Sequence, residues 1–174
     1  MQFSPGIYSP ASVSSLEVPA ALAEFLGSTG ARSRRWTAIL AINPLSGRKI
    51  APDDFEVRLY LGIALLNLKR FVESEEQIRA ALEKNQSAPT AHMYLGLALL
   101  SQNRLNEAQK ELEESAGSKS LDVGLAHKYL GGIYWAQRDY KRAADELETY
   151  LRLMPKAADA EKTRVAIKDL RSRR

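Results

Sequence analysis

The sequence repeats itself three times with a period of about 34 residues. Leu61-Gly62 recurs as Leu95-Gly96 and as Leu130-Gly131, at steps of 34 and 35 residues. Each period contains two segments with apolar residues at helical spacing, joined by a short polar turn. A fixed period that carries two helices predicts a helical solenoid, in which each unit buries its apolar face by stacking on its neighbours. Two further positions keep the same steps, a small one (Ser74, Ala108, Ala143) and a large aliphatic one (Ile78, Leu112, Leu147).

Turn and capping residues set the expected helix boundaries. The two helices of each period are separated by Lys69-Arg70-Phe71, Asn103-Arg104-Leu105 and Arg138-Asp139-Tyr140. Asp53 or Asp54 suits the N-cap of the first helix, and Asp122 that of the fifth. We therefore expect helices near residues 54–68, 71–84, 89–101, 105–116, 123–137 and 140–153.

These repeats resemble the tetratricopeptide repeat family, whose pattern combines Leu-Gly, aromatic and small residues with a closing Pro. The third repeat fits best, with Leu130-Gly131, Tyr134, Ala143, Leu147 and Pro155. The resemblance implies an all-α protein, a right-handed α-solenoid of three helix-turn-helix repeats plus a C-terminal capping helix. The expected repeats cover residues 55–88, 89–122 and 124–157.

The two ends of the chain are less regular. Residues 1–54 form an irregular N-terminal segment, within which residues 18–27 favour a short helix and residues 36–43, followed by Pro44, resemble the tail of a second helix. A degenerate partial repeat in this segment is one interpretation. At the other end, residues 156–172 predict a seventh, mostly polar helix that covers the open end of the solenoid and leads into a basic tail, within a region spanning residues 158–174.

The resemblance also implies a partner-binding groove lined by the first helix of each repeat. The side chains at its inward positions are mainly apolar, which favours capture of a peptide or helix. A second interpretation has the chain's own residues 16–42 covering the groove. The positions of the family's carboxylate clamp hold no charge, so we expect no clamp of that kind. The expected groove residues are Leu59, Ile63, Leu66, Met93, Leu97, Leu100, Lys128 and Trp135.

Catalytic chemistry has little support in the sequence. The chain has no Cys, and its two histidines, His92 and His127, occupy one repeat position, where inter-helix packing is the better interpretation than a metal site. No phosphate-binding loop or nucleophile elbow is present. Acidic runs such as Glu75-Glu76 and Glu113-Glu114 are expected to be solvated. We therefore predict a protein that is not an enzyme, with no cofactor and no metal.

Charge and hydropathy narrow the expected partners. The net charge is +4, and the basic clusters lack interleaved aromatics, so nucleic acid is not an expected partner. No apolar run approaches the roughly 20 residues of a membrane span, and the N-terminus lacks the features of a secretory signal. We expect a cytoplasmic, non-catalytic protein-interaction scaffold with a protein or peptide partner. Two alternatives stay open: a self-associating structural module, and an accessory subunit of a larger enzyme or secretion assembly.

Overall fold

The computed structural model describes residues 54–118 and 123–173. Within these ranges the regular structure is helical, and no strand occurs. The chain divides into two compact units, residues 1–86 and 87–174, which we describe separately. The helix predicted over 18–27, the tail predicted at 36–43 and the expected cap at Asp122 all lie outside the described residues.

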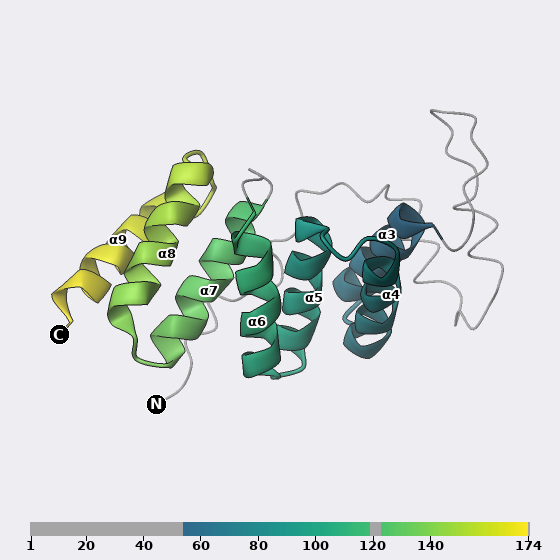
Figure 1. Cartoon of the computed structure of the whole chain (residues 1–174). Helices are drawn as coiled ribbons and strands as arrows, with labels where there is room; N and C mark the ends of the chain where they lie inside the picture. Colours follow the sequence, from purple (N-terminus) through teal and green to yellow (C-terminus); the bar gives the residue numbers. More distant parts are fainter. Residues whose placement is uncertain (1–53, 119–122, 174) are drawn as a thin grey trace. The chain divides into compact units, whose positions relative to one another are not determined.

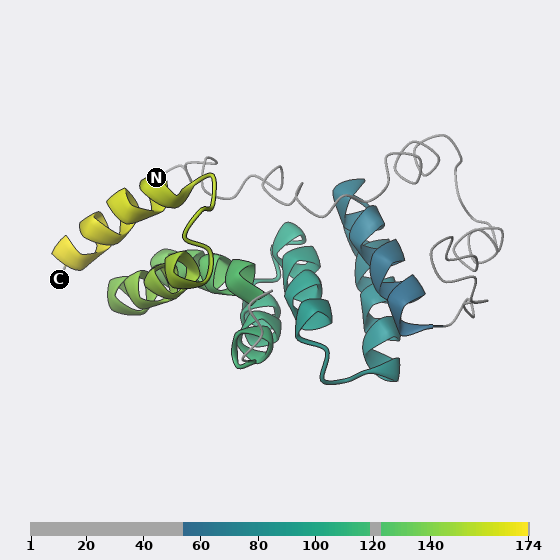
Figure 2. The same ribbon diagram turned by 90° about the horizontal axis from the view of Figure 1, so that it is seen from above.

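The described helices match the predicted repeat pattern. All six predicted repeat helices begin and end within one residue of their expected bounds. In the second unit, α5 to α9 follow one another in chain order, and each packs against the next (Figures 1 and 2). The first unit contains α3 (Phe55–Asn67) and α4 (Phe71–Lys84), and the second contains α5 (Pro89–Ser101), α6 (Leu105–Ala116), α7 (Gly124–Ala136), α8 (Tyr140–Leu153) and α9 (Ala160–Ser172).

The turn between the two helices of a repeat has the same backbone in all three cases. Lys69, Asn103 and Arg138 adopt left-handed φ angles of 60°, 62° and 64°. In the first turn, the N–H of Arg70 donates to the carbonyl of Leu65, and the N–H of Lys69 donates to that of Leu66. The other two turns repeat both bonds. This Schellman arrangement satisfies the last carbonyls of the first helix and reverses the chain.

A glycine brings the two helices of each repeat into close contact. A Cβ atom on Gly62 would lie 2.4 Å from Cγ1 of Ile78, and one on Gly96 would lie 2.6 Å from Cγ of Leu112. Gly131 repeats the arrangement with Leu147, at 2.8 Å. Any side chain here would overlap the facing helix, so the recurring Leu-Gly is a packing requirement.

Polar bonds fix the beginnings of several helices. Asp54 caps α3 by accepting a hydrogen bond from the backbone N–H of Glu56 at 3.1 Å. The sequence had offered Asp53 or Asp54 for this N-cap. In α4, the guanidinium of Arg70 binds Glu73. The start of α8 reverses these charges, because the carboxylate of Asp139 accepts bonds from the backbone and side chain of Arg142.

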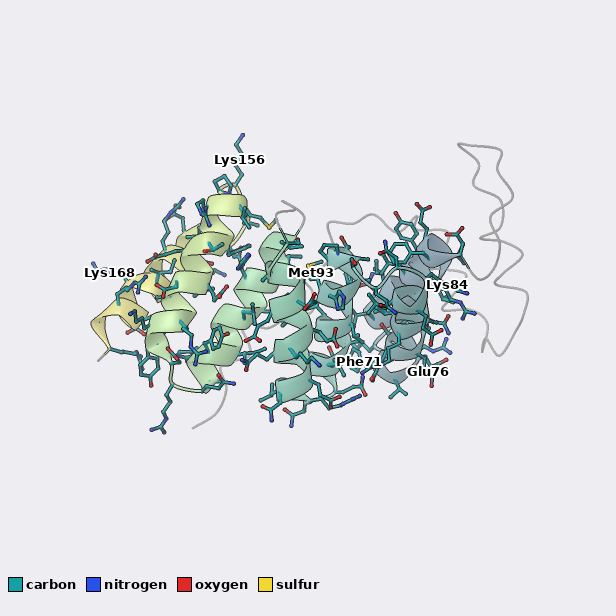
Figure 3. All side chains as sticks on the ribbon, viewed as in Figure 1. Phe71, Glu76, Lys84, Met93, Lys156 and Lys168 are labelled. Atoms are coloured by element: carbon teal, nitrogen blue, oxygen red, sulfur yellow. The ribbon has the colours of Figure 1, made fainter. Side chains whose placement is uncertain are left out.

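The last helix starts later than predicted. The helix expected from residue 156 begins at Ala160, because the chain after α8 first makes two turns. In these turns the N–H of Ala157 donates to Met154 and the N–H of Ala160 donates to Ala157. Lys156 projects from this connection and Lys168 from α9 itself (Figure 3). Along α9, Ala160, Thr163 and Leu170 are buried, and Ile167 is half-buried.

The first helix of a repeat is covered on more sides than the second. In α5 the only exposed residue is Ser101, and in α7 it is Ala136. In contrast, α6 and α8 each bury one stripe and expose charged residues along the opposite face. A helix that is apolar all round belongs in an interior, whereas an amphipathic helix belongs at a surface.

Candidate functional site

The predicted groove residues lie on the first helices, but most of them are covered. Leu59, Ile63 and Leu66 are buried on α3 of the first unit. In the second unit, Met93 is 2% exposed and Leu97 5% exposed, and Met93 can be located on α5 in Figure 3. Lys128 on α7 is also buried. The remaining two, Leu100 and Trp135, are half-buried.

Leu100 and Trp135 occupy equivalent places in consecutive repeats. Each stands four residues after the glycine of its repeat, at Gly96 and Gly131, near the C-terminal end of its helix. Both belong to the second unit. An apolar side chain therefore retains some exposure at the same position of two successive first helices. Tryptophan is enriched among the residues that dominate binding energy at interfaces.

Lys128 is held by groups of the same chain. Its Nζ lies 2.6 Å from Oδ2 of Asp159 and 5.7 Å from the centre of the Tyr150 ring. The hydroxyl of Tyr150 donates to Oδ1 of Asp159 at 2.6 Å. Since Asp159 immediately precedes α9, this cluster joins α7, α8 and the start of the capping helix. The charge of Lys128 is thus neutralised inside the protein.

Burial and charge shift the pKa values in this cluster. Burial of Asp159 disfavours its carboxylate, but the hydrogen bonds from Lys128 and Tyr150 outweigh that effect and lower its pKa. Burial, with the nearby Asp159 carboxylate, raises the pKa of Tyr129 to about 12. The pKa of Tyr150 is also raised, first by burial and then by its bond to Asp159. All three groups therefore keep their neutral-pH charge states over a wide pH range.

A second polar network links the outer parts of the same unit. The hydroxyl of Tyr134 on α7 donates to Oε1 of Glu113 on α6 at 2.7 Å, and the guanidinium of Arg142 on α8 lies 4.4 Å from the Tyr134 ring centre. Burial and the Glu113 hydrogen bond raise the pKa of Tyr134 to about 12. This network connects the second repeat to the third.

The two histidines bond to carboxylates within their own repeats. Nδ1 of His92 lies 2.7 Å from Glu111, and Nδ1 of His127 lies 2.7 Å from Glu146. Each pair joins the first helix of a repeat to the second, which agrees with the predicted inter-helix role. Among the described residues, no group of three or more His, Asp and Glu side chains is arranged to hold a metal ion.

One acidic run differs from its prediction. Glu75 was expected to be solvated with its neighbour Glu76, but it is 9% exposed. Arg79, four residues later on α4, donates to its Oε1 at 2.9 Å. This charge-assisted bond on one helix face compensates for the burial of the carboxylate.

Comparison with known proteins establishes the class of this helical-repeat scaffold. A tetratricopeptide repeat family model matches three overlapping segments, residues 20–89, 61–122 and 95–160. The chain belongs to the tetratricopeptide repeat family. Proteins built from such repeats are typically scaffolds without catalytic activity of their own, and protein–protein interaction is the coarse function of this chain. No curated protein matches the sequence.

The fold is shared with a solved structure. The structure titled "Crystal structure of MamA" has a TM-score of 0.58 and 16% sequence identity, covering 79% of this chain and 81% of that one. A second structure, "MamA MSR-1 C2", has a TM-score of 0.48 and 19% identity, covering 69% of this chain and 78% of that one. At this identity the first comparison shows a shared fold alone. No described helix is long and apolar enough to cross a membrane.

Proposed function

We propose that this protein is a non-catalytic scaffold that holds a peptide or helix of a partner protein through the groove positions of α5 and α7. The observation that carries the proposal is the equivalent, half-buried placement of Leu100 and Trp135 in consecutive repeats. Apolar side chains at a regular spacing can receive successive apolar anchors of a bound segment. The buried groove positions, Met93 and Leu97 among them, support these two rather than contact the partner directly.

The proposed partner segment is apolar rather than acidic. Lys128 is the one charged residue among the eight predicted groove residues, and it already pairs with Asp159. The positions equivalent to a carboxylate clamp in the second unit hold Tyr94, Leu125 and Tyr129. A C-terminal carboxylate would find no unpaired cation at these positions. Affinity should therefore depend on apolar contact and respond weakly to salt.

A peptide-display selection against the full-length chain tests this function. Selected peptides should share apolar residues, and Trp135→Ala or Leu100→Ala should weaken their binding about tenfold or more, as at an interface hot spot. Leu105→Ala is the matched control, because Leu105 is 40% exposed on the second helix α6. Circular dichroism would verify that all variants are folded. Equal binding by Trp135→Ala, Leu100→Ala and the control would contradict the proposed site.

The described residues favour neither alternative role. Their exposed large apolar side chains are Tyr60, Val72, Leu105 and Val165, and single exposed apolar residues are normal on a protein surface. A concentration-dependent mass in analytical ultracentrifugation would support self-association instead. Dependence of soluble expression on a co-expressed subunit would support the accessory role.

A further inference from the structure

The turns that follow α5 and α7 differ in charge beside equivalent groove positions. Asn103 stands three residues after Leu100 at the end of α5. Arg138 stands three residues after Trp135 at the end of α7. In each turn the backbone N–H of this residue donates to the carbonyl of the groove residue, at 2.9 Å in the first case and 3.0 Å in the second. Both turn residues are exposed, so a cation lies next to Trp135 where a neutral amide lies next to Leu100.

The residues that follow the two turn positions do not compensate for this difference. They form ion pairs within their own helix turns, Arg104 with Glu107 and Asp139 with Arg142. Each pair carries no net charge. The guanidinium of Arg138 forms no ion pair with any described residue. Its positive charge is therefore available to a bound segment.

Backbone geometry disfavours arginine at this turn position. Arg138 has a left-handed φ of 64°, as do Asn103 at 62° and, in the first unit, Lys69 at 60°. Among residues with a Cβ atom, Asn and Asp adopt this conformation most readily, because their short polar side chains can bond locally, and Asn is a usual alternative to Gly after the end of a helix. Residues held in disfavoured backbone regions occur often at ligand-binding sites. The turn after α7 thus holds a long basic side chain where the fold alone favours Gly or Asn.

We propose that Arg138 is a specificity-determining residue of the groove, which places an acidic residue of the bound segment beside Trp135 and so fixes the direction in which the segment lies. The inference rests on the proposed function, because it adds a polar contact to the same Leu100 and Trp135 site. Charge complementarity at an interface fixes register and specificity more than it adds affinity. The apolar anchors remain the main source of affinity, and one exposed ion pair changes it about two- to fivefold.

Two synthetic peptides test the direction of binding. Both contain the apolar core of one display-selected peptide, with Glu on one flank and Gln on the other, and they differ only in which flank carries the Glu. The full-length protein should bind one of them about two- to fivefold more tightly in fluorescence anisotropy, and high salt should remove the difference. The exchange variant, Asn103→Arg with Arg138→Asn, should prefer the other peptide. Equal affinities in the parent protein, or the same preference in both proteins, would overturn the proposal.

Single substitutions separate Arg138 from its surroundings. Arg138→Asn should abolish the preference between the peptides and raise the thermal midpoint, because Asn tolerates the left-handed backbone better. An arginine that served the turn alone would leave the preference intact. Lys141→Asn is the matched control, because Lys141 is an exposed cation on the second helix α8, and it should keep the preference. Loss of the preference in Lys141→Asn but not in Arg138→Asn would overturn the proposal.

Failure of the proposed function would give a different result. Trp135→Ala should weaken the binding of both peptides alike, because it removes the apolar anchor that they share. If Trp135→Ala bound both peptides as tightly as the parent protein does, the groove site itself would be contradicted. If Trp135→Ala lost binding while the parent protein showed no preference between the peptides, the site would stand and only the role of Arg138 would be overturned.

Discussion

The helices α5 and α7 differ from α6 and α8 in how their surfaces are used. Before their last residue, α5 and α7 have no exposed side chain, whereas α6 and α8 expose charged residues along one face. All four helices belong to the same unit and to the same repeats. The first helix of each pair therefore supplies interior, and the second supplies the boundary with solvent. A side chain at a groove position of a first helix must be judged as core before it is judged as a binding residue.

The largest expected effect is a difference in stability between the same substitution, Leu→Ala, made on a first helix and on a second helix. Leu99→Ala on α5 should lower the free energy of unfolding by about 2–5 kcal/mol, because Leu99 is 0% exposed and its loss leaves a cavity. Leu105→Ala on α6 should change it by no more than about 0.5 kcal/mol. Urea unfolding of both variants measures the difference. Similar losses in the two would remove the distinction between first and second helices.

The ion pair between buried Lys128 and half-buried Asp159 should make the stability of the protein depend on pH in the acid range. Asp159→Asn should cost about 1.5–3 kcal/mol at neutral pH by weakening bonds to Lys128 and Tyr150. Since the folded-state pKa of Asp159 is lowered, its contribution is present above the unfolded-state pKa near about 3.9 and is lost as the pH falls through the folded value. Unfolding curves from pH 7 to pH 2 should therefore converge for the parent and the variant. Asp169→Asn, at an exposed pair with Arg173, is the control and should cost at most about 1 kcal/mol; an equal cost at the two sites would contradict the role of the cluster.

The close contact between the helices of a repeat can be broken with one methyl group. Gly96→Ala would place Cβ 2.6 Å from Cγ of Leu112, and overpacking of this kind costs about 1–3 kcal/mol. That exceeds the roughly 0.5–1 kcal/mol by which Ala is favoured over Gly in a helix, so the thermal midpoint should fall. At Gly117 a Cβ would meet nothing closer than 3.5 Å, and Gly117→Ala should be neutral or stabilising. A rise in the midpoint for Gly96→Ala would show that the contact is not required.

The smallest expected effect is a gain in stability when one buried serine is replaced and a loss when another is replaced. Ser115 is 0% exposed and its Oγ has no hydrogen-bond partner among the described residues, so Ser115→Ala should stabilise the protein by about 1 kcal/mol. Ser74 is equally buried, but its Oγ donates to the carbonyl of Gly62 at 2.7 Å, so Ser74→Ala should destabilise it by a similar amount. Calorimetry of the two variants should show shifts of opposite sign. Shifts of the same sign would contradict this hydrogen-bond assignment.

The repeat pattern made the helices predictable to within one residue, because their boundaries depend on local chemistry. Each first helix ends at a turn whose left-handed residue, such as Asn103, follows the last apolar position. The recurring glycine, such as Gly96, marks the contact with the second helix. These features lie close together in sequence and recur at a fixed period, so three copies support one another.

The cluster around Lys128 could not be predicted in the same way. Asp159 is 31 residues from Lys128 in the chain, and its position suited a favourable interaction with the α9 dipole. In the structure its carboxylate instead binds Lys128 and Tyr150. Tyr150 also departs from the small residue found at Ala81 and Ser115, the equivalent positions of the other repeats. This difference, in the last repeat before the capping helix, was the one sequence feature that could have indicated the cluster.

The burial of the groove positions could not be predicted from the local sequence pattern either. Family resemblance indicates which side of α5 faces inward, but the cover of that side depends on residues distant in sequence. Leu97 and Leu100 are both leucines three residues apart, yet the first is buried and the second is half-buried. Apolar composition alone could not separate a binding residue from a core residue at these two positions.

The most direct test is the stability of Leu97→Ala measured beside that of Leu105→Ala. Leu97 stands at a groove position of α5 and is 5% exposed, whereas Leu105 on α6 is 40% exposed. If the Leu97 position of α5 belongs to the core, Leu97→Ala lowers the free energy of unfolding by about 2–5 kcal/mol and Leu105→Ala changes it by about 0.5 kcal/mol or less. Equal, small effects of the two substitutions would show that the groove side of α5 is open surface, and would contradict the account.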